Sequence, residues 1–417
     1  MSKEQTAGGA EDGRVELVVD SDGLLAFTQA LVRTRSVVDP ALGTTEAAAA
    51  AVVLAKMREF GWEPLVEEVA PGRPNVVAFV TGGGGDGPTL VFEGHTDVVT
   101  EGDRADWAFD PYSGEIVDGK LHGRGSADMK SGLAAAIYAV RALQLAGPFP
   151  GRVAVCALVD EEGMMLGAKH VAASGLLAGV DGAVICEPEG GEICTTAKGA
   201  IRLRFDLRGV MAHGAMPHIG RNPVAAAGSL LMALERLQSQ LRAENGMGDG
   251  IEALSITPTV LGAGTAPQIN VIPSAAEIFV DVRTTPAIDH VELLGRLAEL
   301  GSSVSASYGV TATLTVIDDR PPVEISRSHP MVTALAAAHL AVVGEPAVFG
   351  TVPGTTDGTI LTRDTSVPTV VYGPGGKWIA HQADEFVLVE EIIQAAMVYA
   401  LTAREFLSGV SHDVADG

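Results

Sequence analysis

Two neighbouring glutamates, Glu161 and Glu162, follow Asp160 directly after an apolar run from Val153 to Val159. A short apolar run of this kind predicts a buried strand, so the three carboxylates should stand where that strand ends. In open α/β sheets, functional groups gather beyond the carboxyl ends of the strands. Neighbouring residues there point in different directions, so one carboxylate can hold a metal ion while the other accepts a proton. The alternative is that both glutamates belong to the first turn of the following helix.

Histidine and aspartate occur together at the end of another predicted strand. His95 and Asp97 are separated by one residue, a spacing that places both side chains on the same side of an extended chain. The Asp97 carboxylate could then accept the N–H of one imidazole nitrogen while the other nitrogen binds metal. The same pair could equally form a purely structural hydrogen bond.

Three further groups could complete a metal site. Asp128 lies in a glycine-bounded loop just before a predicted helix, where an aspartate often caps the helix instead. Glu187 ends an apolar run, and a glutamate at a buried strand is costly unless it is paired or binds metal. His381 follows the glycine-rich segment 373–376, although a single histidine is more often structural. Together with the groups above, these side chains are the kind of ligand set that a pair of zinc ions requires.

The order and spacing of these motifs, from about Leu24 to Ala403, resemble the M20 metallopeptidases, the family of acetylornithine deacetylase, succinyl-diaminopimelate desuccinylase, aminoacylase and glutamate carboxypeptidase. The resemblance implies two zinc ions per subunit, for which cobalt or manganese could substitute. It also implies that Asp97 supports one ligand histidine and that Glu161 is the general base. The implied ligands are His95 and Glu187 for one ion, Glu162 and His381 for the other, and Asp128 between both ions.

The same resemblance assigns roles to residues outside the metal site. It implies that His213 reaches the active site of a neighbouring subunit, where it would stabilise a tetrahedral oxyanion. It further implies that Asn270 and Arg283 contact a substrate carboxylate, although an asparagine can also form a turn and an arginine at a strand end usually faces solvent. The segments around Thr356 and Gly375 would line the acyl and carboxylate pocket.

A length of 417 residues exceeds one ordinary hydrophobic core and predicts two domains. Apolar runs alternate with helix-like segments in residues 21–197, and the pattern resumes in residues 317–417. This alternation predicts a mostly parallel α/β/α sandwich that carries the metal site. Residues 198–316 follow the order β-α-β-β-α-β of a ferredoxin-like α+β domain, which by the resemblance would be an inserted lid and dimerisation domain. The polar and acidic residues 1–20 are expected to form a disordered tail.

Composition and charge exclude several functions. The chain contains 28 Lys and Arg against 52 Asp and Glu, and its formal net charge of −24 would repel nucleic acid and anionic membranes. No apolar stretch is long enough to span a bilayer, and residues 1–20 differ from a secretory signal. The 3 cysteines form no CxxC pair and favour buried thiols in a reducing compartment, so we expect a cytoplasmic protein.

These observations predict a dinuclear zinc-dependent amidohydrolase, acting as a homodimer on the N-acyl amide bond of a small carboxylate-bearing amino-acid derivative. Two alternatives stay open. The same machinery could cleave a peptide bond as a carboxypeptidase or dipeptidase, or the chain could be a binding protein that keeps the fold without turnover. Specificity could depend on Glu189, where many members of the family have a small hydroxyl residue. If Glu189 faces the pocket, it should alter the preferred substrate charge.

Overall fold

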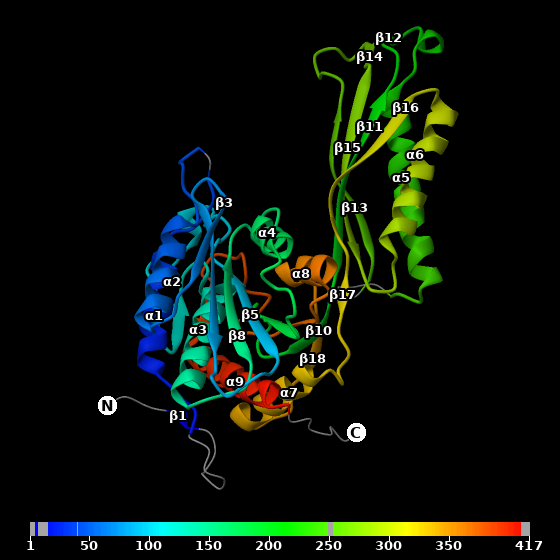
Figure 1. Ribbon diagram of the computed structural model, residues 1–417. Helices are drawn as coiled ribbons and strands as arrows, with labels where there is room; N and C mark the ends of the chain where they lie inside the picture. The colour runs from blue at the N-terminus through cyan, green and yellow to red at the C-terminus, as the bar shows by residue number, and fades with distance from the viewer. Residues whose placement is uncertain (1–4, 7–15, 40, 249–252, 410–417) are drawn as a thin grey trace. The chain divides into compact units, whose positions relative to one another are not determined.

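The structure is a computed structural model, and it describes residues 5–6, 16–39, 41–248 and 253–409. The chain divides into two compact units (Figure 1). Unit 1 consists of Met1–Thr196, Glu324–Val352 and Thr356–Gly417, and unit 2 consists of Ala197–Val323 and Pro353–Thr355. The chain therefore enters unit 2 from unit 1 and later returns to unit 1.

A mixed sheet forms the centre of unit 1. Its described strands are β3 (Leu65–Ala70), β4 (Arg73–Thr81), β5 (Thr89–His95), β8 (Arg152–Leu158), β9 (Gly182–Ile185), β10 (Ile193–Ala197), β17 (Val323–Glu324), β18 (Phe349–Val352) and β19 (Thr369–Val371). The central strands β19, β9, β5 and β8 are parallel neighbours in that order, which confirms the predicted parallel sheet. Toward the edges, β3 pairs with β4, β4 with β8 and β10 with β19 in antiparallel fashion.

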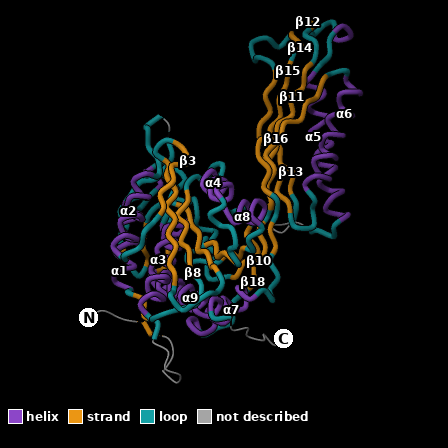
Figure 2. Tube along the Cα trace, viewed as in Figure 1, coloured by secondary structure: helices purple, strands orange, loops and turns teal. Residues whose placement is uncertain are grey.

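Helices cover both faces of this sheet, as the continuous apolar runs predicted (Figure 2). One face carries α1 (Ser21–Arg33), α2 (Ala47–Glu59), α3 (Ser131–Leu145), α7 (Pro330–Val343) and α9 (Val389–Leu407), and the other carries α4 (Leu166–Ser174) and α8 (Asp357–Thr365). Alternation along β5 explains this division: Leu90 and Phe92 belong to the core formed with α3 and α9, while Val91 between them points to the opposite face. The α/β/α sandwich is thus confirmed.

The start of the described chain differs from the predicted tail. Leu17 and Val19 are each only 1% exposed and belong to the main core of unit 1. The strand β2 (Val18–Val19) pairs with β1 (Gln5–Thr6), and the Asp20 carboxylate accepts the N–H of Gly23 and caps α1. Alternate apolar residues in an acidic stretch are sufficient to order residues 16–20. The rest of the predicted tail, residues 1–4 and 7–15, lies outside the described residues.

Unit 2 folds as a ferredoxin-like α+β domain, as predicted. Its elements are β11 (Gly199–Arg208), α5 (Pro223–Glu244), β13 (Ser255–Ala263), β15 (Ala275–Thr284), α6 (His290–Tyr308) and β16 (Thr311–Arg320). The strands form an antiparallel sheet in the order β13-β15-β11-β16. Leu203 and Phe205 of β11 are buried with the helices, while Arg202 and Arg204 alternate with them and are partly exposed. Among the described helices of both units, none combines the length and apolar character needed to cross a bilayer.

Candidate metal centre

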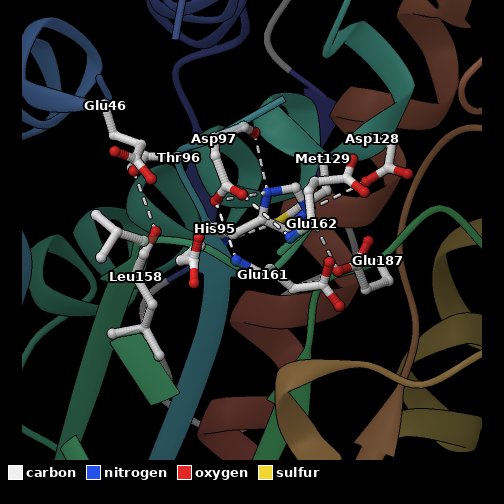
Figure 3. Close-up of polar contacts among 12 residues, drawn as sticks. Glu46, His95, Thr96, Asp97, Asp128, Met129, Leu158, Glu161, Glu162 and Glu187 are labelled. Atoms are coloured by element: carbon white, nitrogen blue, oxygen red, sulfur yellow. Dashed lines mark hydrogen bonds and ion pairs between the residues drawn. The ribbon is translucent and has the colours of Figure 1, made fainter. Parts of the chain in front are cut away.

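The candidate metal centre lies beyond the carboxyl ends of the parallel strands of unit 1 (Figure 3). His95 is the last residue of β5, Glu162 follows β8 after a tight turn, and Glu187 follows β9. Figure 3 shows these side chains gathered with that of Asp128, which precedes α3. Parallel strands that end at a common edge thus bring together acids that are far apart in the sequence.

Two groups of side chains in this centre have their ligand atoms close enough for each group to hold a metal ion. In the first group, Nε2 of His95 lies 3.1 Å from Oδ1 of Asp128 and 3.5 Å from Oε1 of Glu187. In the second group, Nε2 of His381 lies 3.0 Å from Oε1 of Glu162 and 3.2 Å from Oδ2 of Asp128. Asp128 therefore directs one carboxylate oxygen to each group. Nitrogen and oxygen donors around a shared carboxylate suit a pair of borderline divalent cations.

Burial makes this cluster of charges unfavourable by itself. Burial, followed by the charge of Asp128, raises the pKa of Glu187 well above its ordinary value. Hydrogen bonds with Asp128 and Glu162 raise the pKa of His381 to about 10. Burial alone would lower the pKa of His95, but the surrounding carboxylates, Glu187 foremost, raise it. Buried carboxylates are costly without compensation, and bound cations would stabilise them.

The contacts of Asp97 differ from the prediction. Nδ1 of His95 donates to the backbone carbonyl oxygen of Asp97 at 3.0 Å, whereas the Asp97 carboxylate oxygen Oδ1 is 3.6 Å away, beyond hydrogen-bond distance. The carboxylate instead accepts the backbone N–H groups of Glu161 at 3.3 Å and Glu162 at 3.0 Å. Asp97 therefore orients His95 through its main chain and the two glutamates through its side chain. Once the ring is neutral, the bond at Nδ1 leaves Nε2 of His95 as the nitrogen that can bind metal.

A turn after β8 aims the two glutamates. Asp160 has a left-handed backbone conformation, with a φ of 69°, and its carboxylate binds Arg73 at 2.6 Å. The same carboxylate accepts the N–H of Met164 at 3.0 Å, which closes the turn. Arg73 is in turn bound by Glu46, which is fully buried. Arg73 and Glu46 were not predicted as part of the site, because both belong to segments far from the acidic motif in the sequence.

Asp128 does not cap a helix, which was the alternative interpretation of its position. Helix α3 begins at Ser131, and Lys130 stands at its cap position. Asp128 belongs to the short segment Ser126–Lys130, in which its own φ of −114° and ψ of 98° are not helical. Its carboxylate bonds the two histidines of the candidate centre instead.

Thr356 and Gly375, predicted to line the substrate pocket, both belong to unit 1. Thr356 is buried at the cap position of α8. Gly375 has a φ of 86°, and a Cβ atom there would lie 2.9 Å from the Cβ atom of Ala127, which precedes Asp128. Only glycine therefore allows the loop 373–376 to approach the Asp128 segment so closely. The roles of Thr356 and Gly375 toward substrate stay predictions.

The remaining predicted residues belong to unit 2. The strands β12 (Ala212–His213) and β14 (Val271–Ile272) pair with each other. His213 and Asn270 are neighbours there, because the N–H of Gly214 donates to the carbonyl oxygen of Asn270 at 2.7 Å. Arg283 lies eight residues beyond Ala275 along β15, a distance of about 26 Å in an extended strand. The roles of Asn270 and Arg283 toward substrate stay predictions.

Glu189 is buried and already has charged and polar partners. Its carboxylate binds Nζ of Lys377 at 2.6 Å and accepts a hydrogen bond from the Cys194 thiol at 3.2 Å. Nζ of Lys377 also binds Glu192 at 2.8 Å. Burial raises the pKa of Glu189 even though the lysine ammonium opposes that shift. The Glu189 charge is therefore balanced within the protein by Lys377, and its effect on the preferred substrate charge stays a prediction.

Residues 91–405 match peptidase family M20/M25/M40, and the chain belongs to this family. It is a hydrolase that acts on amide or peptide bonds, and the enzymes of the family depend on metal. The chain is 32% identical over 353 residues to the succinyl-diaminopimelate desuccinylase of Cereibacter sphaeroides, a match that covers 81% of this chain and 88% of that protein. The succinyl-diaminopimelate desuccinylase of Methylibium petroleiphilum is 31% identical over 397 residues, which cover 92% of this chain and 98% of that protein.

Several solved structures with the same fold are peptidases. Aminopeptidase PepT from Bacillus cereus matches with a TM-score of 0.75 and 20% identity, over 93% of this chain and 99% of that one. A dinuclear metal binding peptidase of family M20 from Bacillus subtilis matches with a TM-score of 0.69 and 20% identity, over 94% of this chain and 99% of that one. At such identities the likeness shows the fold alone.

Proposed function

We propose that the protein is a dinuclear zinc-dependent amidohydrolase that cleaves the N-acyl amide bond of a small carboxylate-bearing amino-acid derivative. The observation that carries the proposal is Asp128, whose two carboxylate oxygens serve two complete groups of ligand side chains. The desuccinylases that match most of the chain at about 30% identity support the N-acyl substrate. The same site would also suit a peptide bond, which is the alternative of a carboxypeptidase or dipeptidase.

Five side chains would hold the ions: His95 and Glu187 for one, Glu162 and His381 for the other, and Asp128 for both. Cobalt or manganese could replace zinc, since none of these donors is a thiolate. When bound, such a pair of cations lowers the pKa of a shared water and polarises the carbonyl of the scissile amide.

Glu161 would serve as the proton carrier. It stands beside Glu162 and is oriented by the same Asp97 carboxylate, but it is not one of the ligand groups. Burial raises the pKa of Glu161 well above its ordinary value. A carboxylate with a raised pKa is a stronger base, so Glu161 would accept the proton of the attacking water at its carboxylate and return it to the leaving nitrogen.

Unit 2 would act as a lid and dimerisation domain. We propose that His213 of a second copy supplies a hydrogen-bond donor for the tetrahedral oxyanion. Because Asn270 is the neighbour of His213, it would reach the substrate from the same copy. Arg283 would then contact the substrate carboxylate from the other chain, since it lies near the opposite end of β15.

Two glutamate variants test this function on the zinc-loaded protein. Glu161→Gln should keep two ions per chain and lose at least about 10²-fold in kcat, because the proton carrier is gone. Glu162→Gln is the matched control, and it should lose affinity for one ion because a ligand is gone. Activity is measured on a panel of N-succinyl and N-acetyl amino acids and of dipeptides. Unchanged turnover of Glu161→Gln with metal bound would reject the mechanism, and turnover of dipeptides alone would select the peptidase alternative.

A further inference from the structure

Two chain segments supply Asp128 and His381, and a small sheet joins them beside the metal centre. The strand β7 (Lys120–His122) precedes Asp128 and pairs with β6 (Ile116–Val117) and with β20 (Phe386–Leu388), which follows His381. The N–H of Gly123 donates to the carbonyl oxygen of Glu385 at 2.9 Å, which extends this pairing toward the centre. The two segments are therefore one local structure, although about 250 residues of sequence separate them.

Glu385 is the side chain that connects this local structure to the ligands. Its Oε1 accepts the backbone N–H groups of Ala127 at 2.9 Å and Asp128 at 3.1 Å. Its Oε2 forms a short ion pair with Nη1 of Arg124, and Nη2 of the same guanidinium donates to the carbonyl oxygen of His381 at 3.2 Å. Glu385 and Arg124 are buried, with 0% and 2% of their surface exposed. One ion pair thus holds the main chain at both Asp128 and His381.

The two histidines of the centre differ in how they are held. His95 is buried, and its Nδ1 is fixed by the carbonyl oxygen of Asp97. The His381 side chain is 52% exposed, and within the described part of the chain its Nδ1 has no hydrogen-bond partner. A ligand histidine is normally oriented by a bond at its second ring nitrogen. His381 has a left-handed backbone with a φ of 66°. The hydrogen bond from Arg124 to its carbonyl oxygen fixes the main chain of His381 and so replaces an orienting bond at Nδ1.

On the basis of the proposed dinuclear site, we propose that Glu385 and Arg124 are positioning residues for the second ion, the one bound by Asp128, Glu162 and His381. Loss of the pair would free the main chain at two of these three ligands. The first ion would keep two ligands that the pair does not hold: Glu187, which follows β9, and His95, whose ring is fixed by Asp97. The second ion should therefore lose more affinity than the first.

Stepwise zinc titration of the metal-free protein against a competing chelator measures both dissociation constants. Glu385→Gln keeps the size and one acceptor oxygen but removes the charge, and Arg124→Lys keeps the charge but cannot bond Glu385 and His381 together. In either variant the second zinc ion should bind about 10- to 100-fold more weakly, as is typical when the partners of metal ligands are removed, while the first changes less than about threefold. The absorption spectrum of the cobalt-loaded variants should show weaker binding of cobalt at the second site only. This readout does not depend on enzyme activity.

Asp318→Asn is the control, because Asp318 forms a similarly buried ion pair with Arg320 at 2.6 Å in unit 2. It should leave both zinc affinities as in the unchanged protein. Equal weakening of both ions in Arg124→Lys, or no weakening in either variant, would overturn the positioning role. If Glu385→Gln fails to fold, Arg124→Lys alone decides. Failure of the unchanged protein to bind a second ion would instead refute the proposed function.

Discussion

Metal binding should displace protons from the histidines of the candidate centre. In the metal-free protein the pKa of His381 is about 10, because Asp128 and Glu162 bond its ring. An imidazole with that pKa is more than about 99% protonated at pH 7.5, whereas one with an ordinary pKa near 6.5 is about 10% protonated. The carboxylates around His95 raise its pKa as well, against the effect of burial. A ligand imidazole must be neutral, so binding of two ions should release close to one proton from His381 and, from His95, more than the roughly 0.1 that an ordinary imidazole would release.

Calorimetric titration of the metal-free protein with zinc at pH 7.5 measures this number. The observed heat is plotted against the ionisation enthalpy of several buffers, and the slope gives the protons released. A metal-bound water or a protonated carboxyl group that loses its proton on metal binding would only increase the number of protons released. A total below about 0.5 would therefore refute the reasoning. The sign of the pH dependence follows from the raised pKa: protons compete with metal, so the apparent affinity should rise with pH until His381 is neutral, above about pH 10.

Two further substitutions separate the observed contacts from the predicted ones. Asp97→Asn should lower kcat by about 10- to 100-fold while both ions stay bound, because its carboxylate orients Glu161 and Glu162 whereas the hydrogen bond that fixes His95 comes from the Asp97 main chain. Loss of metal from the purified variant would contradict this. Glu189→Gln should change the ratio of kcat/KM between acidic and basic substrates by less than about threefold, because Lys377 already neutralises Glu189. A change above about tenfold would place Glu189 in the pocket after all.

Much of the fold follows from local patterns in the sequence. The helix-like patterns of residues 131–145, which are rich in alanine, and of residues 330–343 predict helices from local sequence alone, and α3 and α7 have these same bounds. Residues 171–177 also have a helix-like pattern, but α4 covers Leu166–Ser174 and ends there because Gly175 adopts a left-handed conformation with a φ of 76°. Helix α8 (Asp357–Thr365) was not predicted, as its polar sequence has no clear apolar stripe.

The candidate ligands could be found from sequence because each stands next to a recognisable strand end or loop. The residues that hold these ligands in place could not be found in this way. Glu385 bonds groups about 250 residues away in the chain, and Arg73 reaches Asp160 from β4, which neighbours β8 in the sheet but is distant from it in the sequence. No local pattern encodes such contacts, because the sequence around a loop carboxylate can be the same whether that carboxylate faces solvent or a buried amide group. The sequence by itself determined which donors end the strands. The tertiary structure alone decided which donors share Asp128 and which buried charges keep the ligands in place. It also decided that the main chain of Asp97 holds His95. These features depend on distances between segments that meet only when the chain is folded.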